Sequence, residues 1–506
     1  MKILGISSGY HDAALSLIDG SEILFAGHAE RYSKHKHDKE LNQGLIYDCL
    51  QHGQPDVIAY YEKPWLKNTR LIYSGQWSEL KHRSWTTRGV VEENLRNSKV
   101  NLHRNNKVNL HNIPVKSFSH HLSHAAAGFQ TSPFNSAAVL IIDAIGEWQT
   151  LSAYEAHYDD KGQAQYKLLF DVKYPHSLGL FYTALTKHVG LKPLDEEYIL
   201  MGMAAYGHPL IYDDLLRDSW TDLDRLQTRY NHHLGTQIDY VKNTHAMDIA
   251  ASAQSILEDA LCSILFKLSC LTKSRNLVYG GGVALNCLAN RFLGQYFPNL
   301  WIMPNPGDAG SSLGACALAW GKKLNWKHPY LGLNIPGEYP VDNILKTLLN
   351  TGIAGVASGR AEFGPRALGN RSLLADPRGP DIKDRVNDIK QRQKFRPFAP
   401  VILADLAQDY FDMPSGWHNS PYMQSVAKCK FPGNYPGICH RDGTSRVQTV
   451  SESDHPGLHN LLTAWYKATG CPMLLNTSLN IRQQPMVNDL NDAKMFQNLY
   501  NVEVLS

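Results

Sequence analysis

Three apolar stretches that each run into a glycine-containing turn constrain the fold of this chain most strongly. They are KILGISSGYHDAA near the N-terminus, AAVLIIDAIGEWQ from Ala137 and NLVYGGGVALN from Asn276. Glycine takes positive φ and adds no side chain, so turns of this kind let backbone N–H groups approach an anion closely. A single such turn is weak evidence, because glycine ends many strands. Repeated in one chain, the turns predict an α/β fold that binds phosphate groups.

The first two turns, GISSGYHD and DAIGE, resemble the paired phosphate loops of an actin/hexokinase-type ATPase fold. In such a fold the third turn, YGGGVALN, would lie near the adenosine of a bound nucleotide. The resemblance therefore predicts ATP as a ligand of the N-terminal part of the chain.

Length and composition narrow the class of protein. The chain has 506 residues, enough for two to four domains, and its 43% hydrophobic and 19% charged content is typical of globular proteins. A net charge of +3 is too small to indicate nucleic-acid binding by itself. The apolar run AAVLII is far too short to span a membrane, and the N-terminus does not read as a signal peptide. Eight cysteines without a CxxC pair indicate reduced thiols and a cytoplasmic location.

A break in pattern at LNIPGEYPVDN predicts a domain boundary, with one domain at 1–335 and another at 336–506. The second domain is more basic near its start. Between Ser358 and Pro400 it carries ten Lys/Arg against five Asp/Glu, and several arginines stand beside Gly or Pro rather than on a helical face.

Histidines in SFSHHLSHAAAGF suggest a metal site. His120 and His124 are four residues apart, so on a helix both imidazoles share one face and His121 points elsewhere. A third ligand must come from another segment, and Asp308 in NPGDAGSSLGA is the best candidate. Hydrogen-bonded structural or surface histidines are the alternative, because HxxxH occurs often by chance.

Ten motifs in one order along the chain resemble the O-carbamoyltransferase family, which decorates antibiotics and nodulation factors. They are SSGYHDAA, HHLSHAAAGFQTSPF, PHSLGLFYTALT, EEYILMGMAAYG, YGGGVALN, NPGDAGSSLGA, GRAEFGPRALGNRSLLADPR, FRPFAP, DGTSRVQTV and LLNTSLN. The resemblance implies an ATPase-fold first domain similar to the protein that makes threonylcarbamoyl-adenosine in tRNA. It also implies an α+β, YrdC-like second domain.

The family's reaction is what the resemblance implies for this chain. Carbamoyl phosphate and ATP, with Mg²⁺, give carbamoyl-adenylate in the second domain. The first domain then transfers the carbamoyl group to an acceptor hydroxyl beside one divalent metal, commonly Fe(II). The family's metal ligands match His120, His124 and Asp308.

The matching motifs also imply roles for other residues of this chain. A hydroxyl needs a base to take its proton, and Asp12 or His11 in GYHDAA is the candidate, with a turn that only supports the phosphate loop as the alternative. The loops of the first domain would bind the nucleotide through Ser8, Asp143, Gly146, Glu147, Gly281, Gly282 and Asn286. Arginine forks and lysine suit the anionic substrates of the second domain, and the positions there are Arg366, Arg371, Lys390, Arg396, Arg446, Asn476 and Ser478, with Arg360 as a further candidate. Lys390 and Arg446 are predicted to be catalytic.

The chain departs from the family pattern at Ile199, where lysine is usual, at Ala205, where proline is usual, and at Leu479, where phenylalanine is usual. The usual Gly-Glu is replaced by Gln483 and Gln484. These departures affect acceptor binding and domain contact rather than the reaction.

The acceptor and two competing functions stay open. A tRNA threonylcarbamoyl-adenosine-type transferase or a non-catalytic actin-fold ATP-binding protein would explain part of the pattern. The segment 63–116 holds eleven Lys/Arg, three Asp/Glu and the tryptophans Trp65, Trp77 and Trp85. Interleaved cations and aromatics suit a hydroxymethylated pyrimidine in a nucleotide or DNA, although a basic insertion whose tryptophans pack on the core is the alternative. A small natural product is a further acceptor class, and a homodimer is possible.

Overall fold

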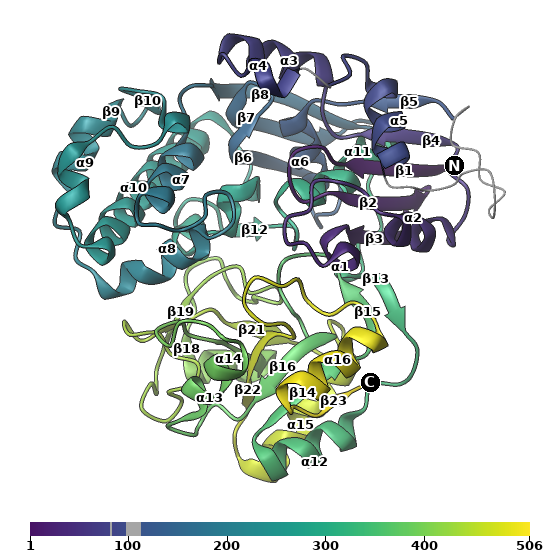
Figure 1. Cartoon of the computed structure of the whole chain (residues 1–506), viewed down its shortest axis with the longest axis vertical. Helices are drawn as coiled ribbons and strands as arrows, with labels where there is room; N and C mark the ends of the chain where they lie inside the picture. Colours follow the sequence, from purple (N-terminus) through teal and green to yellow (C-terminus); the bar gives the residue numbers. More distant parts are fainter. Residues whose placement is uncertain (81–82, 98–112) are drawn as a thin grey trace. The chain divides into compact units, whose positions relative to one another are not determined.

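A computed structural model describes residues 1–80, 83–97 and 113–506, which form two compact units (Figure 1). The first unit comprises 1–33, 37–289 and 295–327, and the second comprises 34–36, 290–294 and 328–506. Residues 328–335 belong to the second unit because strand β13 (Tyr330–Ile335) pairs with β15 (Gly359–Glu362). The domain boundary predicted between residues 335 and 336 remains a prediction.

The first unit contains one five-stranded sheet with the order β3-β2-β1-β4-β5. Its strands are β1 (Lys2–Ser7), β2 (Ala14–Asp19), β3 (Glu22–His28), β4 (Val57–Tyr60) and β5 (Val115–Ser117). β1 pairs antiparallel with β2 and parallel with β4. Helices cover both faces, so β1 is buried along almost its whole length, as its apolar run predicts.

A second five-stranded sheet repeats this arrangement with the order β12-β11-β6-β7-β8. Its strands are β6 (Ser136–Gly146), β7 (Gln149–Tyr158), β8 (Ala164–Lys173), β11 (Asn276–Gly280) and β12 (Asn299–Trp301). β6 pairs antiparallel with β7 and parallel with β11, as β1 does with β2 and β4. The first unit is therefore a duplicated α/β unit, and the predicted actin/hexokinase-type ATPase fold is confirmed.

Two helices lie at the centre of this unit. Helix α6 (His120–Phe129) packs on α11 (Ser311–Trp320), and a Cβ on Gly314 would lie 1.8 Å from the Ser123 carbonyl oxygen. Glycine thus permits the close approach that brings the two helix starts together. The remaining helices and strands of the unit are α1 (Glu30–Ser33), α2 (Gln43–Leu50), α3 (Pro64–Tyr73), α4 (Trp77–Leu80), α5 (Thr87–Asn97), α7 (Leu178–His188), α8 (Glu197–Met203), α9 (Tyr212–Ser219), β9 (Trp220–Asp222), β10 (Gln227–Thr228) and α10 (Ala246–Leu271).

Helix α10 is, among the described residues, the one helix long and apolar enough to cross a membrane. Of its most apolar stretch 67% is buried inside the protein, where it contacts α7, α8 and α9. A core helix has the same properties, so the finding is weak evidence for a membrane segment.

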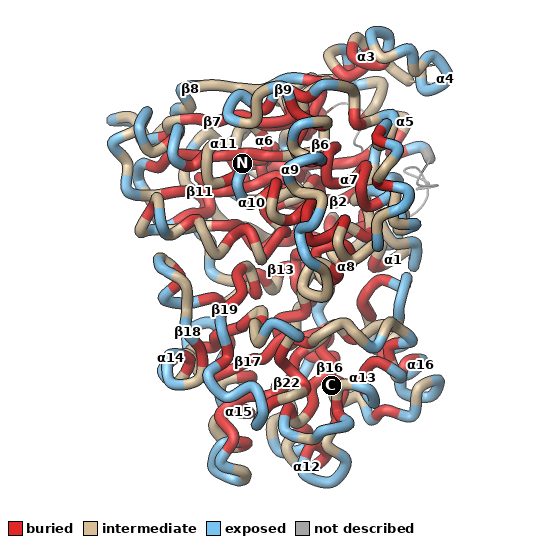
Figure 2. The backbone as a smooth tube through the Cα atoms, turned by 90° about the vertical axis from the view of Figure 1, so that its left-hand side faces the viewer, coloured by how far each residue is buried: buried red, intermediate tan, exposed pale blue. Residues whose placement is uncertain are grey.

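The second unit is α+β, built on a mixed six-stranded sheet with the order β21-β17-β22-β16-β14-β23. The six strands of this sheet are β14 (Ile353–Ala357), β16 (Arg371–Ala375), β17 (Ala399–Leu403), β21 (Gln448–Val450), β22 (Met473–Ser478) and β23 (Val504–Leu505). A separate three-stranded sheet consists of β18 (Phe411–Asp412), β19 (Ala427–Cys429) and β20 (Thr444–Ser445). The helices of this unit are α12 (Val341–Thr351), α13 (Ile382–Ile389), α14 (Ala407–Tyr410), α15 (Pro456–Thr469) and α16 (Leu490–Tyr500). Figure 2 shows buried positions concentrated along the strands of each unit.

Candidate functional site

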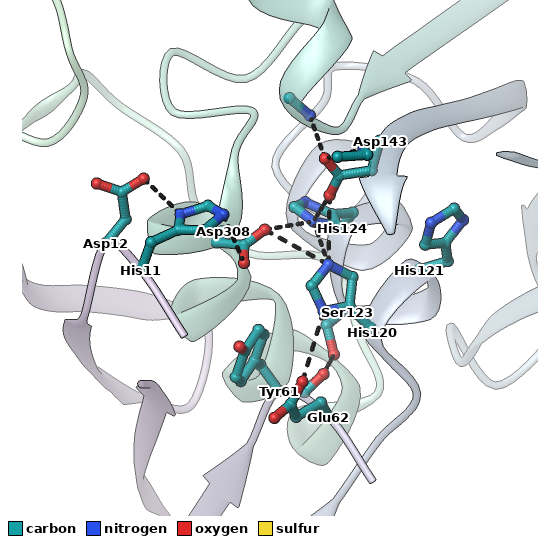
Figure 3. Close-up of polar contacts among 12 residues, drawn as sticks. His11, Asp12, Tyr61, Glu62, His120, His121, Ser123, His124, Asp143 and Asp308 are labelled. Atoms are coloured by element: carbon teal, nitrogen blue, oxygen red, sulfur yellow. Dashed lines mark hydrogen bonds and ion pairs between the residues drawn. The ribbon is translucent and has the colours of Figure 1, made fainter. Parts of the chain in front are cut away.

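Four buried side chains converge in the first unit: His120, His124, Asp143 and Asp308 (Figure 3). The two imidazole Nε2 atoms lie 3.0 Å apart. Asp143 Oδ2 lies 3.3 Å from each of them, and Asp308 Oδ1 lies 3.4 Å from each. One potential ligand atom from each residue lies within 4.8 Å of the others, which is the spacing that a single ion requires.

The local structure explains why these side chains meet. The two histidines stand one turn apart on α6, and Asp143 lies on β6, close to where the strand ends. A Cβ on Gly146 would lie 2.4 Å from the His120 ring, so glycine lets the end of β6 rest against α6. Asp308 begins the short turn that leads into α11. The two histidines predicted from their spacing and the predicted third ligand, Asp308, thus lie together in one cluster.

His121 lies apart from the cluster, as the helical spacing predicted (Figure 3). Its Nδ1 is 2.8 Å from the Ser152 hydroxyl. Burial and the neighbouring His120 lower its pKa well below the usual value. It is therefore a neutral structural histidine.

The imidazoles and carboxylates of the cluster shift one another's pKa. Burial alone would lower the pKa of His120, but Asp308 and Asp143 raise it well above its usual value. The pKa of Asp308 is lowered well below its usual range by His11 and His120, against the effect of burial. Two imidazoles and two carboxylates suit Fe(II), Zn²⁺ or Mn²⁺, and leave positions for other ligands as a catalytic site requires. The residues present therefore fit the divalent metal that the resemblance implied.

His11 and Asp12 adjoin this cluster. His11 Nδ1 is 2.8 Å from Asp12 Oδ2, and its Nε2 is 3.7 Å from Asp308 Oδ2. The other carboxylate oxygen of Asp12 is 2.7 Å from Nδ1 of His37, whose Nε2 lies 2.8 Å from Asp195. Against burial, its two imidazole partners hold the pKa of Asp12 well below its usual value. Asp12 thus orients His11, and His11 is the member that faces the cluster.

The predicted nucleotide loops surround the same place. Ser8 is fully buried, and its hydroxyl has no hydrogen-bond partner among the described residues. Glu147 Oε1 accepts a hydrogen bond from the Lys63 backbone N–H at 2.5 Å, and burial raises its pKa to about 7. Gly281 has φ +86, and the N–H of Gly282 lies 3.4 Å from Asp143 Oδ1.

Asn286 is engaged with the protein itself. Its amide exchanges two hydrogen bonds with Gln254, and its Oδ1 also accepts from the Ala289 N–H. That arrangement fixes the turn after β11 and leaves the side chain little capacity for a nucleotide.

Several predicted residues of the second unit also meet. Lys390 is buried, and its Nζ donates to the Ser478 carbonyl and hydroxyl and to the Asn480 carbonyl and side chain. Burial, with the charges of Arg392 and Arg396, lowers its pKa well below the usual value. Lys390, Arg396 and Ser478 therefore occupy one region.

A second group comprises Asn476, which lies on β22, and two arginines outside the strands, Arg366 and Arg446. Asn476 donates to the Ala367 carbonyl and to Gln448, while its Oδ1 is buried without a partner in the described chain. Arg446 is half-buried, and its Nε likewise lacks a hydrogen-bond partner there. Arg366 is half-buried beside Ala367. Unpaired buried polar atoms are rare, so these fit a site that a substrate completes.

Arg371 does not fit the substrate-binding role predicted for it. The side chain is fully buried, and its guanidinium donates to the carbonyl oxygens of Leu333, Ser358, Gly359, Asn370 and Asn488. A guanidinium has five N–H donors, and here they all serve the backbone. Arg360 similarly donates to the carbonyls of Leu331 and Gly332. Arg371 therefore holds backbone segments of the second unit together, and Arg360 joins β15 to β13.

The basic segment at 63–116 is partly outside the described residues, which omit 81–82 and 98–112. In the described part, Trp65, Trp77 and Trp85 are 52%, 61% and 50% exposed. These exposures do not favour the alternative in which the tryptophans pack on the core.

Three residues at this site were missed by sequence reasoning. Glu62 lies 4.0 Å from Nδ1 of His120 and pairs with buried Lys67, while His37 and Asp195 support Asp12. Glu62 follows the end of β4, just as Asp143 lies near the end of β6. A carboxylate at the end of a strand was therefore the sequence signal that could have identified Glu62.

Comparisons with known proteins give two family matches and several relatives. A family model described as carbamoyltransferase N-terminus matches residues 2–317, and one described as carbamoyltransferase C-terminus matches residues 345–506. The nodulation protein NolNO of Sinorhizobium fredii is 31% identical over 96% of this chain and 76% of its own length. The 3'-hydroxymethylcephem-O-carbamoyltransferase of Amycolatopsis lactamdurans is 25% identical over 98% and 96%. A solved structure of HypF with phosphate and nucleotide is similar over 63% of this chain and 55% of HypF, at 12% identity and a TM-score of 0.34, too low to bear on function.

Proposed function

This chain belongs to the carbamoyltransferase family, and we propose that it is an O-carbamoyltransferase that works in two half-reactions. In the first, carbamoyl phosphate and ATP give carbamoyl-adenylate in the second unit. In the second, the carbamoyl group passes to an acceptor hydroxyl in the first unit. The observation that carries this proposal is the buried cluster of His120, His124, Asp143 and Asp308 with His11 beside it.

The first half-reaction places several anionic groups in the second unit. Water releases phosphate from carbamoyl phosphate, and an oxygen of the resulting carbamate attacks the α-phosphorus of ATP and displaces pyrophosphate. Catalysis here is mainly charge neutralisation and positioning. Arg366, Arg396 and Arg446 are half-buried and suited to the phosphates, and Lys390 is already held by Ser478 and Asn480.

The second half-reaction moves one proton and exchanges one C–O bond. The acceptor oxygen attacks the carbamoyl carbon, the bond from that carbon to the AMP oxygen breaks, and the hydroxyl proton leaves to a base. His11 is the proposed base, because its Nε2 faces Asp308 while Asp12 holds its Nδ1.

The cluster would hold one divalent cation, and Fe(II) is the ion proposed. When bound, the cation neutralises the carboxylates and the phosphate of the adenylate. His120 and His124 would provide Nε2, and Asp143 and Asp308 would each provide one carboxylate oxygen. Glu62 would orient His120, since a carboxylate commonly accepts the other ring N–H of a ligating histidine.

One assay separates the proposal from the alternatives. Purified protein is incubated with ATP, carbamoyl phosphate and hydroxyl acceptors, and pyrophosphate and the mass of the acceptor are followed. Pyrophosphate that appears only with carbamoyl phosphate supports the proposal, and so does an acceptor that gains one carbamoyl group. A requirement for threonine would favour the tRNA-type reaction, and no pyrophosphate at all would favour a non-catalytic ATP-binding protein. His120→Ala should abolish transfer and leave pyrophosphate release intact.

A further inference from the structure

A buried arginine that makes no ion pair in the described chain lies on α3, the helix that begins shortly after Glu62. Arg70 on α3 is 5% exposed, and no hydrogen bond or ion pair joins its side chain to another residue that the structure describes. Its contact is with the ring of Tyr174, whose centroid lies 5.8 Å from the guanidinium carbon. A buried cation without a counter-charge destabilises a protein, so it indicates an anion that binds from outside.

The neighbouring lysine on the same helix face makes the contrast clear. Lys67 lies three residues earlier and is equally buried, but its Nζ contacts both carboxylate oxygens of Glu62, at 2.8 and 3.1 Å. Glu62 in turn faces His120. The described chain therefore gives Lys67 a direct ion pair, whereas Arg70 makes none and feels the charge of Glu62 only at a distance.

Aromatic side chains line the surroundings of Arg70. Trp148 lies 5.3 Å from Tyr73, and Tyr73 lies 6.5 Å from Tyr174, measured between ring centroids. Trp148 is half-buried and donates from Nε1 to Thr69 on α3, which fixes its ring. Tyr73 is 67% exposed, so one end of this aromatic wall (Tyr73, Trp148 and Tyr174) is open to a ligand.

Short segments of the chain link the aromatic wall to the metal-candidate cluster. Trp148 follows Glu147, whose carboxylate binds the N–H of Lys63 directly before α3. Asp143 stands only five residues before Trp148. The charge of Arg70 also acts on the pKa of Tyr10, and Tyr10 precedes His11.

We propose that Arg70 and the aromatic wall form the acceptor subsite, and that the acceptor carries a planar ring and one anionic group. This rests on the proposed function, because the acceptor's hydroxyl must reach the carbamoyl group at the cluster. The anion, a phosphate or a carboxylate, pairs with the Arg70 fork, and the ring packs on Tyr73 and Trp148. A neutral sugar would leave Arg70 without a partner.

Matched pairs of probes test this. One pair is 5-hydroxymethyl-2'-deoxycytidine 5'-monophosphate and its nucleoside, and the other is 4-(hydroxymethyl)benzoate and its methyl ester. Binding to the full chain is measured by calorimetry with saturating AMP present, which fills the position of the adenylate. We expect the charged member of at least one pair to bind about tenfold tighter or more. The pair that shows this distinguishes phosphate from carboxylate, and equal binding within both pairs overturns the proposal.

Variants of two arginines complete the test. Arg70→Met should remove the preference for the charged probe, Arg70→Lys should keep part of it, and Arg88→Met on exposed α5 should leave it unchanged. Without ligand, Arg70→Met should raise the thermal midpoint, because an unpaired buried charge is replaced by an apolar side chain. A lower midpoint would assign Arg70 a structural partner and overturn the proposal. Absence of pyrophosphate release in the wild type would contradict the proposed function without changing the binding result.

Discussion

Arg371→Met should lower the stability of the second unit rather than weaken substrate binding. In the native state the guanidinium donates to five backbone carbonyls, which belong to Leu333, Ser358, Gly359, Asn370 and Asn488. Methionine fills a similar volume but donates no hydrogen bond. The Asn370 carbonyl keeps its hydrogen bond from the Ser358 N–H, but the other four carbonyls lose the donor that the guanidinium supplied.

The magnitude follows from those carbonyls. Each buried carbonyl left without a donor costs about 1–3 kcal/mol. Local relaxation and entering water recover part of this, so we expect a loss of at least about 4 kcal/mol, a value reached only when a buried network is broken. Domains are stable by about 5–15 kcal/mol, so the second unit would approach its unfolding threshold.

Urea denaturation measures the effect, with fluorescence of Trp465 as a probe because it is buried in the core of the second unit. Arg371→Lys keeps the charge but has fewer donors, so it should recover only part of the stability. Arg366→Met is the matched control: this half-buried arginine lies in the segment just before β16, and its loss should cost less than about 1 kcal/mol. If Arg371→Met keeps wild-type stability and loses pyrophosphate release, the structural assignment is wrong and the substrate role predicted from the sequence is right.

The remaining predictions concern the site. Asp143→Asn should lower the ratio of bound metal to protein after loading with Fe(II), measured by elemental analysis; an unchanged ratio would exclude Asp143 as a ligand. Lys390→Ala should stop pyrophosphate release. Asp12→Ala should leave pyrophosphate release intact and slow carbamoyl transfer by about 10²–10⁴-fold. Loss of pyrophosphate release in Asp12→Ala would contradict the assignment of the two half-reactions to different units. Burial alone would lower the pKa of His37, but Asp12 and Asp195 raise it to about 10. A raised pKa stabilises the fold fully below the unfolded value, near pH 6.5, and this stabilisation is lost as pH rises through about 10. His37→Gln should therefore be less stable than wild type by about 1–3 kcal/mol at pH 6, with the gap closing towards pH 10; a gap independent of pH would refute the ionic role. DNA binding through the basic segment should weaken steeply as salt rises, and absence of binding at low salt would leave a small molecule as the acceptor.

Periodicity and turn chemistry predicted most of the first unit. His120 and His124 could be placed on one helix face because helical spacing is local, and glycine-containing turns marked the loops that approach them. Asp143 was predicted as a nucleotide-loop residue, and its contact with both histidines depends on how β6 docks against α6, which no local pattern encodes. Glu62 was missed for the same reason.

The second unit was less predictable. Arg371 and Arg446 have similar sequence surroundings, but one is enclosed by carbonyls and the other keeps a buried nitrogen without a partner in the described chain. That difference arises from tertiary packing. Charge and a Gly/Pro context alone cannot separate a loop-fixing arginine from a substrate-binding one.

The duplicated sheets have a consequence for how the protein matures. His120 and His124 follow the fifth strand of the first repeat, Asp143 stands on the first strand of the second, and Asp308 comes after the fifth strand of the second. Neither repeat alone carries the complete set, and the last contributor is synthesised almost two hundred residues after the first. An ion held by all four side chains can be loaded only after both repeats have folded and docked, so it cannot guide the early folding of the nascent chain.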